Sequence, residues 1–156
     1  MYTIEPIGFV KNNRINIEDD YWGDVISEII ISDKISESSL KGIDGYSHLE
    51  IIFYFHLADP SEISISATHP RNNKKFPSVG IFAQRRKARP NLIGATIVKL
   101  ISSVKNKLVV SGLDAVNGTP VIDIKPVLRE FLPDDKIIQP EWTSEMLKNY
   151  WKPGKK

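Results

Sequence analysis

The segment HLEIIFYFH, from His48 to His56, is the strongest strand signal in the chain. Between its two histidines only Glu50 is charged, and the remaining positions are apolar or aromatic. A nearly unbroken apolar run of this length is typical of a strand that is buried on both faces. We therefore expect this segment to cross the centre of the fold.

Further strand patterns lie on both sides of this segment. The stretch TIEPIGFVK, residues 3–11, reads as a first strand, and β-branched or apolar runs predict others at 25–31, 93–102, 108–113 and 120–124. A shorter apolar run over 79–83 also reads as a strand. The Asn117-Gly118 pair predicts a β-hairpin between the last two strands, because both residues tolerate positive φ.

One helix follows the strands. Pro140 suits the first turn of a helix over 141–150, and Gly154 lies just beyond its end. Many short strands with one terminal helix predict a mainly β fold, a small antiparallel β-barrel with a C-terminal helix. We expect one domain, with the barrel over residues 1–136 and a helical tail of the same domain over 137–156.

Composition excludes several kinds of site. The 156-residue chain has no cysteine, so disulfides, thiolate metal sites and cysteine nucleophiles are impossible. No apolar run approaches the roughly 18 to 20 residues that cross a bilayer. The N-terminus lacks a signal-peptide pattern, so a cytoplasmic protein without a membrane partner is expected.

Positive charge is concentrated in one part of the chain. The segment GIFAQRRKARPNLIG, residues 80–94, holds Arg85, Arg86, Lys87 and Arg89 within five positions. The fifty-one residues from 63 to 113 contain ten Lys and Arg and no acid, whereas the rest of the chain has eleven bases and nineteen acids. This asymmetry favours a surface that meets an anion. A solvated surface, or a homodimer interface facing the acidic remainder, is the alternative.

Familiar catalytic patterns are absent. His48 and His56 lie on one predicted strand, about 26 Å apart at roughly 3.3 Å per residue, so we expect no metal site. There is no G-x-S-x-G elbow and no phosphate-binding glycine fingerprint. His56, where the strand emerges, either lines a pocket or is a satisfied structural histidine.

The stretch LDAVNGTP, from Leu113 to Pro120, holds the first acid after the basic segment. The Asp114 carboxylate could stabilise that segment or bind a cationic ligand. The alternative is a simple turn without a ligand.

Taken together, five motifs resemble the TrmO family of S-adenosylmethionine-dependent tRNA methyltransferases, which act on threonylcarbamoyladenosine beside the anticodon. These are IGFVKN at 7–12, YSHLEIIFYFH at 46–56, HPR at 69–71, GIFAQRRKARPNLIG at 80–94 and LDAVNGTPVIDIKP at 113–126. The resemblance spans about residues 4 to 128. It implies a barrel of antiparallel strands that works as a homodimer.

The resemblance also implies site residues. The methyl donor, S-adenosylmethionine, would meet His56, Leu57, Arg85, Asp114, Ala115, Val116 and Asn117. The tRNA would meet Arg71, Arg86, Arg89 and Asn91. The donor itself supplies the reactive methyl group, so no metal is expected and no catalytic side chain is assigned.

Two departures bear on the substrate. The family's R-P-N-P reads Arg89-Pro90-Asn91-Leu92, and a donor-contacting loop rich in Arg and Gly is replaced by DDYWGD at 19–24. Acids near the pocket could repel RNA or select another substrate. A methyltransferase acting on another nucleic acid or a small molecule, and a non-catalytic RNA-binding or donor-sensing module, therefore remain alternatives.

Overall fold

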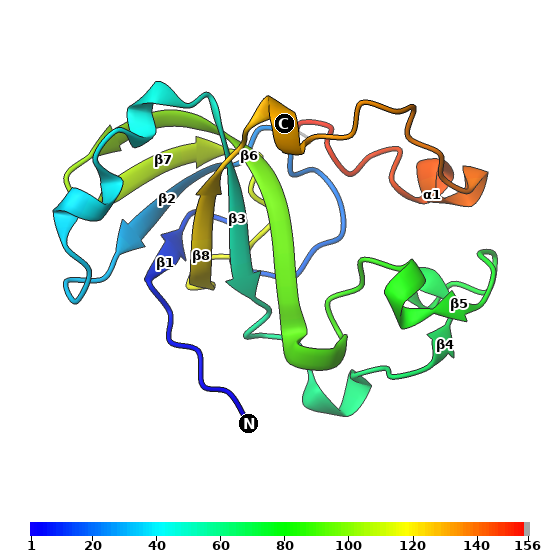
Figure 1. Ribbon diagram of the computed structural model, residues 1–156. Helices are drawn as coiled ribbons and strands as arrows, with labels where there is room; N and C mark the ends of the chain where they lie inside the picture. Colours follow the sequence, from blue (N-terminus) through cyan, green and yellow to red (C-terminus); the bar gives the residue numbers. More distant parts are fainter. Residues whose placement is uncertain (155–156) are drawn as a thin grey trace.

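The computed structural model describes residues 1–154, and in this part of the chain six strands close into an antiparallel barrel (Figure 1). The strands pair in the order β1-β2-β7-β6-β3-β8. Their bounds are β1 Gly8–Lys11, β2 Ile26–Ile31, β3 His48–Tyr54, β6 Ile93–Val104, β7 Lys107–Ser111 and β8 Pro120–Pro126. The predicted fold class is confirmed.

The elements outside the barrel are short. A two-stranded sheet joins β4 (Ala67–Thr68) and β5 (Val79–Gly80), and the helix α1 covers Glu141–Met146. Single 3-10 turns occur at Glu37–Leu40, Ile43–Gly45, Pro60–Glu62, Pro70–Asn72, Ile81–Ala83, Pro90–Leu92 and Arg129–Phe131. No helix in residues 1–154 is both long and apolar enough to cross a bilayer.

Strand β3 lies between β6 and β8, but the expectation that it is buried on both faces is wrong. Leu49, Ile51 and Phe53 are buried inside the barrel, whereas Ile52 is partly exposed and Tyr54 is exposed. A strand in a closed barrel has one inner and one outer face, so its residues alternate in burial even when both sets are apolar. The core comprises Val10, Ile29, Ile31, Leu49, Ile51, Phe53, Val98, Leu108, Val110, Leu113, Ala115 and Val121.

The predicted hairpin at Asn117-Gly118 is also wrong. Strand β7 pairs with β2 and β6, and β8 pairs with β1 and β3, so the two strands are not neighbours. Gly118 does turn the chain, with φ +82, and its N–H donates to Val10 O at 2.7 Å. The turn residues set only the local change of chain direction. Long-range pairing sets which strands become the neighbours of β8.

Three predicted boundaries change. The first strand is confined to Gly8–Lys11, and the apolar run 79–83 gives only the two residues of β5 before a 3-10 turn. Helix α1 ends at Met146 rather than at residue 150. The last two residues of the expected tail, 155–156, lie outside the described part of the chain.

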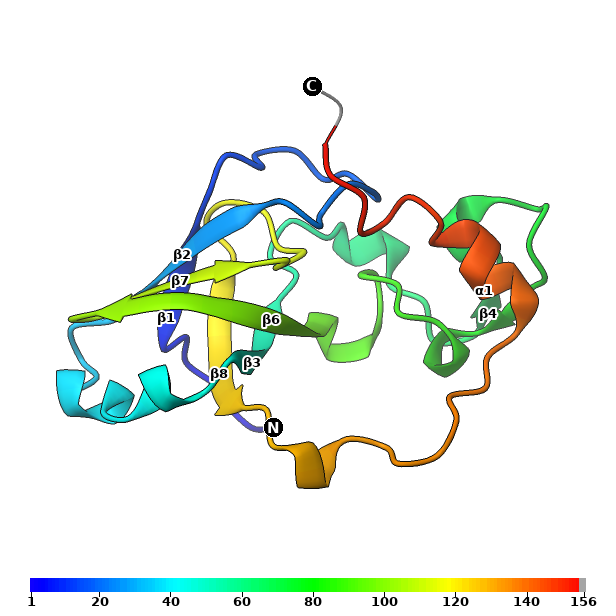
Figure 2. The same ribbon diagram turned by 90° about the horizontal axis from the view of Figure 1, so that it is seen from above.

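A lobe formed by residues 58–92 and the C-terminal tail lie on the same side of the barrel (Figure 2). Contacts join them: the Phe76 and Trp142 rings are 6.1 Å apart between centroids, and Lys75 Nζ is 2.6 Å from Glu145 Oε1. The barrel end, the lobe and the tail therefore meet in one region.

Candidate functional site

The Asp114 carboxylate lies at the end of the barrel, after β7 and the buried Leu113. One oxygen accepts a short hydrogen bond from the Thr96 hydroxyl on β6, and the other accepts one from the Tyr150 hydroxyl in the tail. Two hydroxyl donors from distant parts of the chain therefore fix this carboxylate in place.

The pKa of Tyr150 depends on the charges around its hydroxyl group. Burial raises the pKa of the Tyr150 hydroxyl, and the negative charge of Asp114 raises it further. Arg85 and Arg71 act in the opposite direction on this pKa, so both cations lie close enough to interact with the hydroxyl. Tyr150 thus stays protonated near neutral pH and keeps its proton for the hydrogen bond to Asp114.

Arg85 is exposed and reaches the same end of β6. Its Nη2 donates to Ala95 O at 2.5 Å, next to the Thr96 that holds Asp114. No other hydrogen-bond partner of its guanidinium occurs within residues 1–154. Because a guanidinium carries five N–H donors, Arg85 retains donors for an anionic ligand.

The segment that follows Asp114 is fixed by Asn12, at the end of β1. The Asn12 side-chain amide donates to Ala115 O at 2.9 Å, and its backbone N–H donates to Asn117 Oδ1 at 3.1 Å. Val116 O accepts from the Thr119 hydroxyl at 2.7 Å. Three of the predicted donor-binding residues thus form one rigid wall of the barrel end.

His56 faces this wall. A Cβ built on Gly118 would lie 3.7 Å from His56 Nε2, so the imidazole stands beside the turn. Burial lowers the pKa of His56, which favours the neutral ring. Leu57 follows with 49% of its surface exposed, so an apolar side chain is available to a ligand at the rim.

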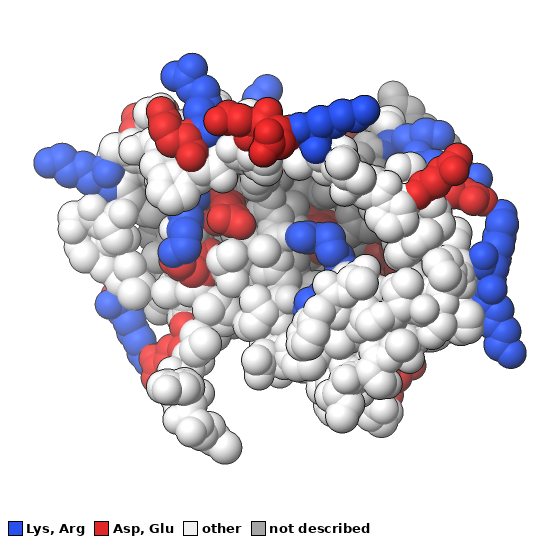
Figure 3. All heavy atoms as spheres, turned by 45° about the vertical axis from the view of Figure 1, so that its right-hand side comes forward, with Lys and Arg blue, Asp and Glu red and all other residues white. Residues whose placement is uncertain are grey.

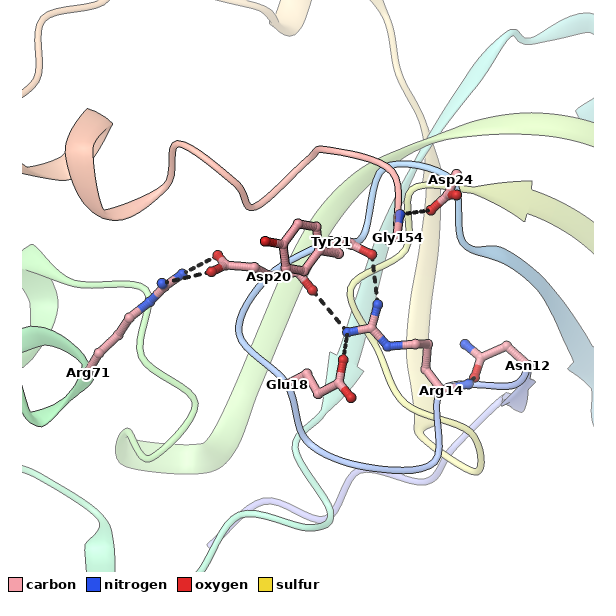
Figure 4. Close-up of polar contacts among 8 residues, drawn as sticks. All are labelled: Asn12, Arg14, Glu18, Asp20, Tyr21, Asp24, Arg71 and Gly154. Carbon is pink, nitrogen blue, oxygen red and sulfur yellow. Dashed lines mark hydrogen bonds and ion pairs between the residues drawn. The ribbon is translucent and has the colours of Figure 1, made fainter. Parts of the chain in front are cut away.

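The residues predicted to bind tRNA are less uniform. Arg71 is already paired: its Nη2 is 2.8 Å from Asp20 Oδ1 (Figure 4). Its Nε is also 3.9 Å from Asp19 Oδ2. The loop of residues 19–24, here called the acidic loop, therefore neutralises part of the positive charge of the basic segment. Arg71 also has φ +54, an uncommon conformation for a residue with a side chain.

The other three lie within the lobe. Arg86 donates to Asn72 Oδ1 at 3.1 Å, and Arg89 donates to Gln84 O at 2.9 Å. Asn91 is exposed with φ +63 in the 3-10 turn before β6. Within residues 1–154 no carboxylate pairs with Arg85, Arg86, Lys87 or Arg89.

The acidic loop is tied to the barrel by Arg14. Its guanidinium donates to the carbonyls of Tyr21 and Asp20 at 2.7 and 3.1 Å and pairs with Glu18 at 3.1 Å (Figure 4). It also lies 3.8 Å from the centroid of the Trp22 ring. Trp22 is only 3% exposed, so it packs in the interior and is not a platform for stacking a base.

The face seen in Figure 3 is hollowed, and charged side chains of both signs lie in and around the hollow. A separate apolar groove of about 330 Å³ lies on the outer barrel wall and contains none of the predicted site residues. Within the described residues no three His, Asp or Glu side chains gather as metal ligands would.

Sequence reasoning missed three contributors to the site, Thr96, Tyr150 and Asn12. Thr96 lies inside a strand pattern, where a hydroxyl gives no distinct signal. Tyr150 lies at the end of a predicted helix and thirty-six residues from Asp114. Asn12 belongs to the IGFVKN motif, and its position directly after a predicted strand was the signal that could have identified it as a site residue.

Comparisons with known proteins identify a family for this chain. Residues 8–132 match the family described as the tRNA-methyltransferase O N-terminal domain. A Methanocaldococcus jannaschii protein named as a probable S-adenosyl-L-methionine-binding protein is 33% identical over 133 residues, which cover 80% of this chain and 91% of that protein. Human tRNA (adenine(37)-N6)-methyltransferase is 36% identical over 104 residues, 67% of this chain.

The human match spans only 23% of that enzyme's length. Among solved structures, TrmO from Pseudomonas aeruginosa superimposes with a TM-score of 0.69 at 26% identity, covering 87% of this chain and 61% of that one. The family match covers most of the chain, and the M. jannaschii relative is matched along nearly its whole length. The chain therefore belongs to the family of the tRNA-methyltransferase O N-terminal domain.

Proposed function

We propose that this protein is an S-adenosylmethionine-dependent methyltransferase that acts on tRNA. The observation that carries the proposal is that Arg85 and Asp114 bind adjacent residues of β6 at one end of the barrel: Arg85 donates to Ala95 O, and Asp114 accepts from the Thr96 hydroxyl. The relatives named for donor binding and for tRNA methylation support the same conclusion.

The residues at the barrel end fit the donor. When bound, S-adenosylmethionine supplies an electrophilic methyl group on a sulfonium sulfur, together with an amino-acid part that carries one ammonium and one carboxylate. Arg85 would bind the carboxylate with its remaining N–H groups, and Asp114 would accept from the ammonium. An ionised carboxylate has about four acceptor positions, so two hydroxyl partners leave room for a cation.

The remaining donor-binding residues would shape the pocket. The neutral His56 ring and the Leu57 side chain would contact the less polar parts of the donor, and the segment Ala115–Asn117 would form the wall behind it. Methyl transfer needs the acceptor nitrogen, the methyl carbon and the sulfur in line, which is a matter of positioning and exclusion of water. The acceptor N–H proton leaves for solvent, and we assign no side chain as its base.

For the acceptor we propose the exocyclic amine of threonylcarbamoyladenosine in the anticodon loop. Arg86 and Arg89 have no carboxylate partner in residues 1–154 and would contact the RNA backbone, with Asn91 beside them. Arg71 would contribute less, because Asp20 already neutralises it. From the family resemblance we also propose that the protein is a homodimer. A measurement of its molecular mass in solution tests this.

The experiment is a methyl-transfer assay with radiolabelled S-adenosylmethionine. Label should enter tRNA that carries threonylcarbamoyladenosine and should not enter the same tRNA lacking that modification. Label that enters only other RNA or only small molecules would show that the methyl acceptor is a different molecule. Binding of donor and tRNA without any transfer would indicate a non-catalytic module and contradict the enzymatic proposal.

A further inference from the structure

The C-terminal residues Asn149 to Gly154, here called the strap, return to the barrel end, where the Tyr150 hydroxyl donates to Asp114. Their backbone is bound to the acidic loop: Tyr21 N–H donates to Asn149 O at 3.1 Å, and Trp22 N–H donates to Tyr150 O at 2.8 Å. At the far end Gly154 N–H donates to Asp24 Oδ1 at 3.0 Å (Figure 4).

The acidic loop is shaped to receive the strap. A Cβ on Gly23 would lie 1.9 Å from Trp151 O, so only glycine permits this approach. The Trp151 ring packs edge-on against Tyr150, 4.9 Å between centroids, and reaches Gly112 after β7. The loop that departs from the family pattern is thus the loop on which the strap docks.

Docking delivers one polar group into the site, the Tyr150 hydroxyl that donates to Asp114. We propose that the strap is a built-in wall of the donor site and that Tyr150 is a positioning residue, which holds Asp114 in the orientation that receives the donor's ammonium. This inference rests on the proposed function. A carboxylate held by hydroxyls on both oxygens is fixed in rotation yet keeps acceptor positions free.

Several contacts favour a permanent wall over a detachable inhibitor. The strap is tied to the loop at both ends, and α1 before it is anchored to the lobe through Phe76–Trp142 and Lys75–Glu145. Such a segment is ordered before any ligand arrives. Pre-ordering reduces the cost of ligand binding, so the strap should raise donor affinity.

The first test is the affinity for S-adenosylmethionine of Tyr150→Phe, measured by calorimetry on the full chain. We expect about tenfold weaker binding, since the ring stays and a hydrogen bond to a charged group is lost. Tyr46→Phe, a half-exposed tyrosine before β3, is the matched control and should bind like the wild type.

A double substitution tests whether Tyr150 acts through Asp114. In an Asp114→Asn background, Tyr150→Phe should cost less than about twofold in further affinity, because the group that it positions is already impaired. A full tenfold loss in that background would show that Tyr150 acts independently of Asp114 and would overturn its positioning role.

A variant outside the pocket tests the strap itself. Gly23→Ala should displace the strap backbone and weaken donor binding about as much as Tyr150→Phe. Gly45→Ala is its control, because a Cβ there meets nothing within 4 Å.

The outcomes separate the two proposals. No donor binding by the wild-type chain overturns the proposed function and this inference with it. Wild-type binding with unchanged affinity in both Tyr150→Phe and Gly23→Ala overturns this inference alone. Tighter binding in either variant would also overturn it, since the strap would then be an inhibitor.

Discussion

The inside of the barrel and its charged end are built in opposite ways. Inside, Leu49, Ile51 and Phe53 pack with apolar residues of neighbouring strands, and the strand pairing sets their positions. At the end, the positions depend on single polar contacts between segments that are far apart in sequence, such as Tyr150 with Asp114 and Arg71 with Asp20.

This difference separates stability from function. Loss of a core side chain removes many contacts and leaves a cavity, so its cost falls on folding. Loss of an exposed charge at the barrel end removes few contacts, so its cost should fall on ligand binding. The proposals above require this separation, and substitutions in the two regions test it.

The largest effect is expected from Phe53→Ala. Phe53 is 1% exposed and packs edge-on against Phe55 at 5.3 Å, so its truncation should lower the free energy of unfolding by about 3–5 kcal/mol. Urea denaturation measures this. Ile97→Ala, at a half-exposed position on β6, should cost under about 1 kcal/mol. Equal losses of unfolding free energy in the two variants would contradict the conclusion that Phe53 belongs to the core and Ile97 to the surface.

The next effect is expected from Arg85→Ala. It should weaken S-adenosylmethionine binding about 10- to 100-fold, because a charge-assisted hydrogen bond contributes about 1.5–3 kcal/mol. The melting temperature should hardly change, since Arg85 is exposed and has one hydrogen bond, to Ala95 O. Arg129→Ala, on the 3-10 turn after β8, is the control. A large loss of stability in Arg85→Ala without weaker donor binding would contradict the separation of stability from ligand binding.

A smaller effect concerns tRNA. Arg86→Ala should weaken tRNA binding about fivefold and reduce the salt slope by about one, as expected for one phosphate contact. Arg71→Ala should have less effect, because Asp20 is 2.8 Å from its guanidinium. Asp20→Asn should strengthen tRNA binding by freeing Arg71. Weaker binding in Asp20→Asn would show that this ion pair supports the RNA surface instead.

The smallest effect concerns His56 and pH. Burial lowers the pKa of His56 in the folded chain, so the unfolded chain binds the proton more readily. The stability that this group contributes is therefore complete above pH about 6.5 and is lost as the pH falls through the lowered pKa of the folded chain. The unfolding free energy of His56→Gln, compared with wild type over this range, should depend less on pH.

The barrel could be predicted from sequence because alternating apolar strands and turn residues are local signals. Strands 25–31 and 93–102 agree with β2 and β6 to within two residues. The order of the strands could not be predicted in this way: Asn117-Gly118 indicates a turn, yet long-range pairing takes β8 to β1 and β3.

The candidate site was predictable only in part. Arg85 and Asp114 follow from charge placement and the family motifs, and in the structure they bind the adjacent residues Ala95 and Thr96 of β6. Tyr150 and Thr96 were missed, because a tertiary hydrogen bond leaves no pattern in one sequence. The pairing of Arg71 with the acidic loop was missed for the same reason, since their partnership exists only after folding.

The most direct test of the central claim is a crystal structure of the protein with S-adenosylhomocysteine, the demethylated donor. The account predicts the ligand at the barrel end, with its carboxylate at Arg85, its ammonium at Asp114 and the strap in place beside it. A ligand bound elsewhere, such as in the apolar groove on the outer wall, with Arg85 and Asp114 untouched, would contradict it.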